Sequence, residues 1–426
     1  MNKKHILIVS VDYPPNSSIG SRRISSISKG LYEKGFIPHV VTTKNHSLKF
    51  EKQIEIPSEY IHYVKWKDIR VLVKVLESKK ITKYFAKVIN YFFPNSSNTL
   101  PERRLQYWIN PAIKECLQII KNNNIKLIYS SYNPPASVRV AAAVTEKTGI
   151  PWINEYRDLW TGNPYLSSSG KVKELNWKVE SNLITNADAL VTVSEPLKLD
   201  LIKLHNKPTY VIYNGIDKIN ETKSYQKTSN NIIKIVYTGI IYKGKRDPKQ
   251  LFEALKILKS KNIEVFNRLS IDFYGAKMKE IMGKDVDDFG LEKIINLHDP
   301  ISHDKVIKVQ SEADILLLLG WNNIADEGVV TGKVFEYLSW KKPILALGYI
   351  GGAMDLLLRE TKTGYVVNDP MEICDYIVSM GNIVKTETQL KKFKDQIDIT
   401  EFYRSTQIDS LISIFKETID RNQIRI

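Results

Sequence analysis

The stretch "HILIVSVDYPPNSSIGSRRISSISKGLYEKGFIPHVVTT", residues 5–43, decides which fold class the sequence predicts. Residues 5–11 form a continuous apolar run, typical of a strand that is buried on both faces of a sheet. A polar loop follows, then a helical pattern over 24–34 that ends at Gly35, and a second strand over 38–43. A strand, a helix and a strand in this order indicate a βαβ unit and therefore a parallel sheet.

The same alternation continues along the chain, which has 426 residues and is too long for one ordinary core. We therefore expect an α/β protein with two doubly wound, Rossmann-like domains, at 1–213 and 214–402, that face a central cleft. The polar stretch 215–231 is the expected linker, and the last helix, within 403–426, is expected to pack back on the first domain. The other expected strands are 126–131, 151–156, 189–194, 209–214, 232–239, 269–275, 294–299, 314–319, 342–347 and 364–369, and the other expected helices are 136–148, 172–187, 248–260, 303–312 and 332–340.

Charge and cysteine content restrict the class of protein. Lysine and arginine number 62 against 47 acidic residues, a formal net charge of +15, which favours anionic partners unless it only solvates the surface. The two cysteines, Cys116 and Cys374, lie too far apart for a disulfide framework or a metal motif, which fits a reducing cytosol. The sequence shows no signal peptide and no apolar stretch long enough to span a bilayer, so we expect a cytoplasmic protein.

Parallel sheets bind ligands beyond the carboxyl ends of their strands. With two such domains, the cleft between them is the default site. The loops that this rule singles out are 12–23, 130–135, 156–165, 239–246, 319–333 and 348–352.

Two glycine-containing loops suit phosphate groups. Gly20 precedes a helix and permits close approach of the backbone to an anion, although a plain strand-to-helix turn explains it as well. The spacing there is not G-x-G-x-x-G, which disfavours a dinucleotide-binding dehydrogenase. In the second loop, Lys243, Lys245 and Arg246 are cations that suit a diphosphate, with a solvated basic loop as the alternative.

The segment "VVTGKVFEYLSWKKPILAL", residues 329–347, places two charged side chains among apolar ones. Thr331 is the expected N-cap of a helix whose first turn carries Lys333, so an anion would be stabilised there. Glu336 follows at i, i+3, and its carboxylate could accept two hydrogen bonds from vicinal hydroxyls, as on a ribose. An ion pair between Lys333 and Glu336 on the helix surface is the alternative.

Several motifs together resemble one family. "GKVFEYLSWKKPILAL" (332–347) resembles the donor-nucleotide helix of the retaining glycosyltransferases of the GT-B fold, family 4, and "NEYRDLW" (154–160) is similar to the D-x-R-D-x-W segment of its surface-polysaccharide branch. "YPPNSSIGSRR", "YNPPAS", "VIYNGID", "YTG" and "ADILLLL" follow in the order that this family uses. The resemblance implies transfer of a sugar, with retention, from a nucleotide diphosphosugar to a saccharide or lipid-linked acceptor in bacterial surface polysaccharide synthesis. It also implies a cytoplasmic enzyme, peripheral at the inner face of the cell membrane.

The resemblance also implies site residues. No metal or other cofactor is expected, because cations stabilise the departing diphosphate in such sites. The "DVDDF" segment (285–289) contains the letters of a D-x-D metal motif but lies in an expected surface segment. The implied catalytic residues are Gly20, Arg246, Lys333 and Glu327; the donor-binding residues are Gly239, Lys243, Lys245, Arg246, Val330, Thr331, Gly332, Lys333 and Glu336; the acceptor-side residues are Ser21, Arg22, Asn133, Arg157 and Asp158.

The sequence departs from the family pattern at two places. The family often has two glutamates separated by seven residues, but Gly328 stands where the first is expected. Either a local shift lets Glu327 serve, or backbone N–H groups of 329–331 replace it. Many relatives have a histidine near the acceptor after the Pro-Pro loop, but here that region has Arg139 and no histidine, so no general base is assigned. Arg157 and Asp158 either orient the acceptor or form a buried structural ion pair.

Other interpretations stay open. Residues 60–93 mix basic and aromatic side chains, which suits either an anionic membrane surface or an ordinary helical insertion. We find no nucleic-acid-binding motif, so a nucleic-acid partner is not expected. The rival functions are a GT-B nucleotide-sugar epimerase or hydrolase, a non-catalytic protein that binds a nucleotide or a membrane, and, third, a basic nucleic-acid binder.

Overall fold

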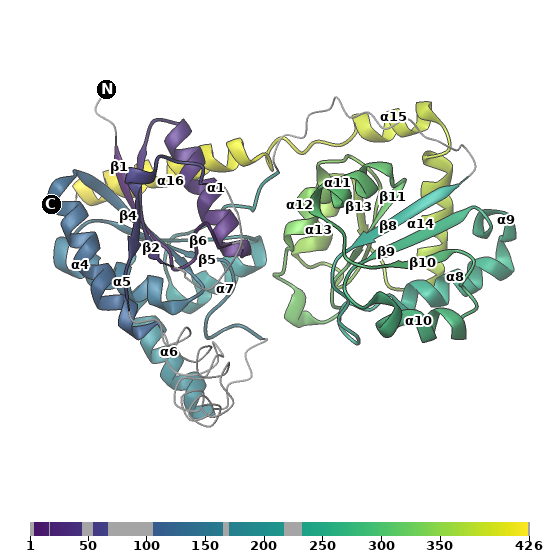
Figure 1. Ribbon diagram of the computed structural model, residues 1–426, viewed down its shortest axis with the longest axis horizontal. Helices are drawn as coiled ribbons and strands as arrows, with labels where there is room; N and C mark the ends of the chain where they lie inside the picture. The colour runs from purple at the N-terminus through teal and green to yellow at the C-terminus, as the bar shows by residue number, and fades with distance from the viewer. Residues whose placement is uncertain are drawn as a thin grey trace, which may run out of the picture. The chain divides into compact units, whose positions relative to one another are not determined.

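The computed structural model describes residues 4–16, 18–44, 54–66, 105–164, 170–216 and 232–424. The chain forms two compact units, which we describe separately. Unit 1 comprises 1–214 and 404–426, and unit 2 comprises 215–403. Each unit has its own parallel sheet with helices packed against it (Figure 1).

The sheet of unit 1 has seven strands in the order β3-β2-β1-β4-β5-β6-β7, and all neighbouring strands are parallel. Val9 in the central strand β1 pairs with Val41 on one side and with Ser130 on the other. The strands are β1 His5–Val9, β2 Ile37–Thr43, β3 Ile61–Val64, β4 Ile125–Tyr132, β5 Trp152–Tyr156, β6 Ala189–Thr192 and β7 Thr209–Val211.

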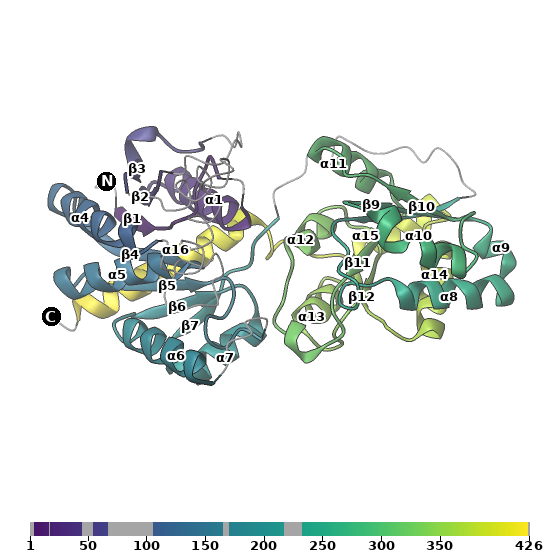
Figure 2. The same ribbon diagram turned by 60° about the horizontal axis from the view of Figure 1, so that its bottom comes forward.

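Helices cover both faces of this sheet. Alternate residues of β1 point to opposite faces, so Ile6 and Ile8 pack in the core with α1 and α16, whereas Leu7 and Val9 pack with α4 and α5. The C-terminal helix α16 therefore belongs to the core of unit 1 and lies beside α1 (Figure 2). The described helices of unit 1 are α1 Ile19–Glu33, α4 Gln106–Asn122, α5 Pro135–Thr148, α6 Gly170–Ile184, α7 Glu195–His205 and α16 Arg404–Gln423. The 3-10 turn η1, Ser58–Tyr60, directly precedes strand β3.

Two expectations for unit 1 were wrong in detail. Helix α1 begins at Ile19 rather than at residue 24, because the Ser18 hydroxyl accepts a hydrogen bond from the Ser21 N–H and caps the helix. The start of the 60–93 stretch is not helical, since Ile61–Val64 pairs with β2 as an edge strand. The rest of that stretch, from residue 67, lies outside the described residues, as does most of the expected linker.

The sheet of unit 2 has six parallel strands in the order β10-β9-β8-β11-β12-β13. The two parallel sheets confirm the predicted α/β class. The strands are β8 Ile233–Thr238, β9 Leu269–Tyr274, β10 Ile295–His298, β11 Ile315–Leu319, β12 Ile344–Leu347 and β13 Gly364–Val366. The helices are α8 Lys249–Lys261, α9 Ile263–Phe266, α10 Met278–Asp288, α11 His303–Glu312, α12 Gly332–Leu338, α13 Ala353–Glu360, α14 Pro370–Ile383 and α15 Glu387–Asp395, with the 3-10 turn η3 Ile324–Asp326.

The strand order fixes where each sheet offers a ligand site. The order of strands reverses between β1 and β4 in unit 1 and between β8 and β11 in unit 2. In doubly wound sheets, ligands bind beyond the carboxyl ends of the strands at such a reversal. The loops there run from Ser10 to Ser18 and from Asn133 to Pro134 in unit 1, and from Gly239 to Pro248 and from Gly320 to Thr331 in unit 2.

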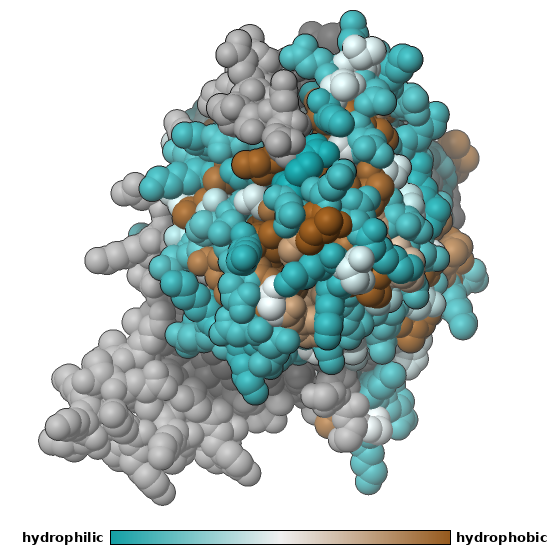
Figure 3. Space-filling view, turned by 90° about the vertical axis from the view of Figure 1, so that its right-hand side faces the viewer, coloured by the Kyte–Doolittle hydropathy of each residue, from teal (hydrophilic) through white to brown (hydrophobic). Residues whose placement is uncertain are grey.

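On the face of Figure 3, hydrophobic residues occur in patches between hydrophilic ones. Among the described helices, none combines the length and the apolar character that crossing a membrane requires.

Candidate functional site

The site of unit 2 begins with a contact between Gly239 and Lys333. Gly239 follows strand β8, and a Cβ atom built there would lie 1.6 Å from the Lys333 Nζ. The φ angle of Gly239 is +155°, which other residues rarely adopt. A glycine is therefore required at this position, and the structure brings together two predicted donor-binding residues, one after β8 and one in the first turn of α12.

The ammonium group of Lys333 lies in an unusual environment. Its Nζ is 4.8 Å from the centre of the Tyr237 ring, within reach of a cation–π interaction. Burial, followed by the positive charge of Arg246, lowers the pKa of Lys333 to about 8, against the opposing effect of Glu336. Arg246 and Lys333 therefore repel each other, and an anion that binds between them would relieve this repulsion.

Glu336 places a carboxylate beside these cations. Its Oε1 atom is buried, and within the described part of the chain it has no hydrogen-bond partner. No ion pair joins it to Lys333 in the described structure, so the alternative of a surface ion pair is wrong. Thr331 lies at the N-cap position of α12, but its hydroxyl does not cap the helix and is also buried without a partner among the described groups. The Glu336 Oε1 atom and the Thr331 hydroxyl therefore remain available for a ligand.

The basic loop after β8 divides its cations between different partners. Lys243 forms an ion pair of 3.5 Å with Asp285 of α10, in which the two side chains are 68% and 37% exposed. Lys245 lies 4.7 Å above the Trp321 ring. Arg246 is half-buried and is the one of the three whose charge acts on Lys333. Of the predicted diphosphate-binding cations, Lys333 contacts the Gly239 turn, and the charge of Arg246 acts on Lys333.

The acidic pair before α12 has two distinct environments. The buried Asp326 carboxylate accepts a hydrogen bond of 3.0 Å from the Trp321 N–H, so it holds the loop. The Glu327 side chain is exposed, while its backbone carbonyl accepts a 2.6 Å hydrogen bond from the Ala353 N–H. The Val329 N–H donates to the Asp326 carbonyl, which removes one of the three backbone donors that were expected to replace a glutamate. Val330 is buried and Gly332 is exposed.

In the described parts of the chain, no group of His, Cys, Asp and Glu side chains has the arrangement of a metal site. Asp285, from the segment that contains the D-x-D letters, instead pairs with Lys243 on the exposed side of α10.

In unit 1, Arg157 brings the predicted acceptor-side residues together. A Cβ atom at Gly20 would lie 2.3 Å from the Arg157 Nη1, so the guanidinium packs against the Gly20 backbone. Arg157 also donates hydrogen bonds of 3.2 Å to the Tyr132 carbonyl and 2.5 Å to the Asn133 carbonyl. Gly20, Asn133 and Arg157 thus meet beyond the carboxyl ends of the strands.

The other acceptor-side predictions have mixed outcomes. The Ser21 hydroxyl is fully buried and has no partner among the described groups, whereas Arg22 is exposed. Asp158 is exposed, and Arg157 bonds to carbonyl groups, so the two do not form a buried ion pair.

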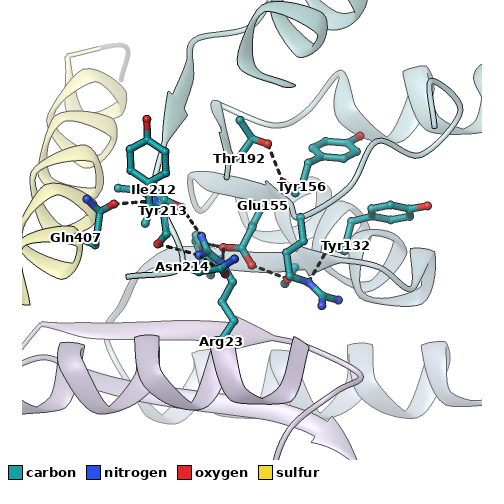
Figure 4. A network of polar contacts seen from close by, with 12 residues as sticks. Arg23, Tyr132, Glu155, Tyr156, Thr192, Ile212, Tyr213, Asn214 and Gln407 are labelled. Carbon is teal, nitrogen blue, oxygen red and sulfur yellow. Dashed lines mark hydrogen bonds and ion pairs between the residues drawn. The ribbon is translucent and has the colours of Figure 1, made fainter. Parts of the chain in front are cut away.

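The sequence interpretation missed a buried ion pair between Arg23 and Glu155. The Arg23 Nε atom lies 2.7 Å from Glu155 Oε1, and the two side chains are 3% and 0% exposed (Figure 4). Burial alone would raise the pKa of Glu155, but Arg23 and the hydroxyls of Ser131 and Tyr129 hold it below its usual value. The helical period could have indicated that Arg23 is buried, because it lies four residues before the core residue Ile27 and therefore on the same face of the helix.

Comparison with known proteins agrees with this geometry. Residues 20–218 match the family model described as Glycosyltransferase Family 4. The matched segment covers slightly less than half of the chain. No curated protein sequence gives a significant match.

Several solved structures share the fold of this chain. A glycosyltransferase from Rickettsia africae ESF-5 has a TM-score of 0.63 at 16% identity, over 98% of this chain and 99% of that one. Sucrose-phosphate synthase from Thermosynechococcus elongatus has a TM-score of 0.62 at 12% identity, over 98% and 100%. HepE from Anabaena, in complex with UDP-glucose, has a TM-score of 0.55 at 14% identity, over 96% and 99%. These likenesses confirm the expected GT-B fold class.

Proposed function

We propose that this protein is a family 4 glycosyltransferase that moves a sugar from a nucleotide diphosphosugar to a saccharide acceptor, with retention at the anomeric carbon. The observation that carries the proposal is the buried, unpartnered Oε1 atom of Glu336 beside the Lys333 ammonium, within the described residues. A buried carboxylate oxygen without a donor is costly. The two vicinal hydroxyls of a nucleotide ribose would supply the missing donors.

Lys333 and Arg246 suit the diphosphate of the donor. Burial is the main cause that lowers the pKa of Lys333, and repulsion by Arg246 is the second. A diphosphate would compensate both positive charges. The same cations would stabilise the negative charge that develops on the diphosphate as the sugar leaves. We therefore propose transfer without a metal ion, and expect a chelator to leave the rate unchanged.

The acceptor is proposed to bind in unit 1, where Arg157 gathers Gly20 and Asn133. The "NEYRDLW" segment supports an acceptor in bacterial surface polysaccharide synthesis, such as a lipid-linked saccharide. The net charge of +15 supports peripheral contact with the anionic inner face of the cell membrane. HepE was solved with UDP-glucose, so UDP-sugars are the first donors to test.

The test is thermal unfolding with UDP, GDP, ADP and their sugars. A nucleotide at about 100 times its Kd would stabilise the native state by about 2.7 kcal/mol. We expect one base to raise the midpoint of the native chain and this rise to vanish in Glu336→Ala. The control is Glu280→Gln, which alters an exposed pair with Lys277 and should keep the full response.

Two outcomes contradict the proposal. Equal shifts in Glu336→Ala and the native chain would refute the ribose role of Glu336, and no shift with any nucleotide in a folded sample would refute donor binding. Product analysis then separates transfer from epimerisation or hydrolysis, because only transfer needs an added acceptor.

A further inference from the structure

Arg23 lies where three parts of unit 1 meet. On one side it pairs with Glu155 at the end of strand β5. On the other side its Nη2 donates 2.8 Å to the Ile212 carbonyl, and its Nη1 donates 3.0 Å to the Tyr213 carbonyl and 3.2 Å to Asn214 Oδ1. Figure 4 shows the guanidinium between the carboxylate and this segment. A single side chain from α1 therefore connects a central strand to the last residues of unit 1 before the chain enters unit 2.

The two segments that connect the units both form hydrogen bonds near Arg23. The chain leaves unit 1 after Asn214 and returns to it at Arg404. The Arg404 Nη1 donates 2.7 Å to the Asn214 carbonyl, and the Gln407 side chain accepts 2.7 Å from the Tyr213 N–H. The outgoing and returning segments are thus bonded to each other, and Arg23 bonds the outgoing one to α1.

The same strand end also holds the predicted acceptor-side groups. Glu155 lies in β5 and Arg157 directly follows the end of that strand, and both side chains contact residues of α1. Glu155 holds Arg23, and Arg157 packs against Gly20, one turn earlier on α1. Tyr129 and Ser131 of the neighbouring strand donate hydrogen bonds of 2.6 Å each to the Glu155 carboxylate, which leaves it little freedom to move. The start of α1 and the exit segment therefore share one buried support.

We propose that Arg23, held by Glu155, is a positioning residue for sugar transfer that fixes the start of α1 relative to the segments through which the chain passes between its units. The inference rests on the proposed function, in which the acceptor binds near Gly20 and the donor binds to unit 2. Arg23 touches neither ligand in this assignment. Its effect should therefore appear in the transfer step and not in donor binding.

The guanidinium geometry gives the inference a sharp test. Arg23→Lys keeps the positive charge opposite Glu155 but cannot reach the carboxylate and two carbonyls at once. We expect kcat for transfer to fall at least tenfold, while the donor KM and the thermal shift with the preferred nucleotide stay within twofold of the native values. The matched control is Lys34→Gln, which breaks an exposed 2.6 Å pair between the same helix and Asp409 and should keep full kcat.

A second variant separates positioning from support of the fold. Arg23→Met with Glu155→Gln removes both buried charges, which commonly restores stability, but it does not restore the bonds to Ile212 and Tyr213. We expect a folded protein with normal nucleotide binding and low kcat. Full kcat in this double variant, or in Arg23→Lys, would overturn the inference.

Two further results complete the test. If neither variant folds, Asn214→Ala decides, because it removes one contact of Arg23 outside the buried pair: a fall in kcat of at least threefold supports the inference, and unchanged kcat overturns it. Absence of transfer by the native chain with every donor would instead refute the proposed function. The two failures are therefore distinguishable.

Discussion

The Lys333 ammonium is held against strand β8 by the ring of Tyr237, whose centre lies 4.8 Å from Nζ. No carboxylate neutralises this ammonium within hydrogen-bond distance in the described structure, although Glu336 is close enough to raise its pKa. An aromatic ring attracts a cation without donating a counter-charge. Lys333 is thus oriented by the fold while its charge stays available to an anionic substrate.

Substituting Gly239 should displace this lysine. In Gly239→Ala the new Cβ would lie 1.6 Å from the Lys333 Nζ, so the side chain must move away from the turn. We expect a loss of about 1–3 kcal/mol in unfolding free energy, from the positive φ angle and the steric overlap. Nucleotide diphosphate affinity, measured by calorimetry, should fall at least tenfold.

Gly283→Ala is the control for that substitution. Gly283 lies in helix α10, and apart from its chain neighbours and the nearby backbone of its own helix no atom lies within 4 Å of an added Cβ. Alanine there should stabilise the protein by about 0.5–1 kcal/mol and leave nucleotide affinity unchanged. Native affinity in Gly239→Ala would show that Lys333 does not need its observed position.

The depressed pKa of Lys333 predicts how nucleotide binding depends on pH. Without a bound nucleotide, Lys333 has a pKa of about 8, and a bound diphosphate would raise this pKa by stabilising the charged form. The charged form therefore dominates below pH 8, and affinity should fall as the pH rises above that value, by up to about tenfold per pH unit. Titration of UDP by calorimetry between about pH 7 and pH 9 measures this slope, above the range in which a terminal phosphate titrates.

Lys333→Arg tests the assignment of that slope. Arginine stays protonated throughout this range, so the decline that begins near pH 8 should disappear even if the overall affinity changes. The same decline in both proteins would assign the titration to another group. A flat profile in the native chain would remove Lys333 from the diphosphate site.

Strongly patterned elements were predictable, and contacts between distant segments were not. The run of residues in β11, Ile315–Leu319, is wholly apolar and wholly buried, so its sequence alone indicates a central parallel strand. Helix α4 was not predicted, and it contains Pro111, a residue that usually marks a helix boundary. The position of Lys333 on its helix could be predicted from its motif. Its contact with Gly239 could not, because that contact depends on the order of strands in the sheet.

The same limit explains the choice of Arg22 over Arg23. Both arginines suit an anion, and only the rotation of α1 shows that Arg22 is exposed and Arg23 is buried. The expected start of the helix at residue 24 left both in a loop, whereas the Ser18 cap places both within the helix. An error of five residues in a boundary therefore changed which side chain was assigned to the site.

Asp326 and Glu327 should respond differently to substitution. Asp326→Ala removes the acceptor of the Trp321 N–H, so we expect a loss of about 1–2 kcal/mol of unfolding free energy in urea. Glu327→Ala changes an exposed side chain and should stay within about 0.5 kcal/mol of the native stability. If Glu327 acts on the donor sugar, the kcat of the Glu327→Ala variant should fall about 10- to 100-fold with little change in donor KM. Native kcat in Glu327→Ala would show that the backbone of the loop serves instead.

Three histidines on neighbouring strands form a chain of close contacts in unit 1. His5 Nδ1 lies 3.0 Å from His39 Nε2, and His39 Nδ1 lies 3.4 Å from His62 Nε2. His62 Nδ1 lies 3.2 Å from the Glu115 carboxylate, and Tyr60 packs edge-on against the His39 ring. If each neutral ring carries its proton on Nδ1, every ring donates to the next and the last donates to Glu115. A second proton on His39 would remove an acceptor from this chain.

The chain of histidines predicts loss of stability in acid. Burial, followed by the charges of His62 and His5, lowers the pKa of His39 from 6.5 to about 4. Between these values the unfolded chain binds a proton that the folded one does not, so the unfolding free energy falls as the pH falls. We expect a loss of about 1–2 kcal/mol between about pH 7 and pH 5, measured by urea unfolding. In His39→Phe this dependence should shrink, whereas His303→Gln, at an exposed position in α11, should keep it. An unchanged dependence in His39→Phe would assign the acid sensitivity to other groups.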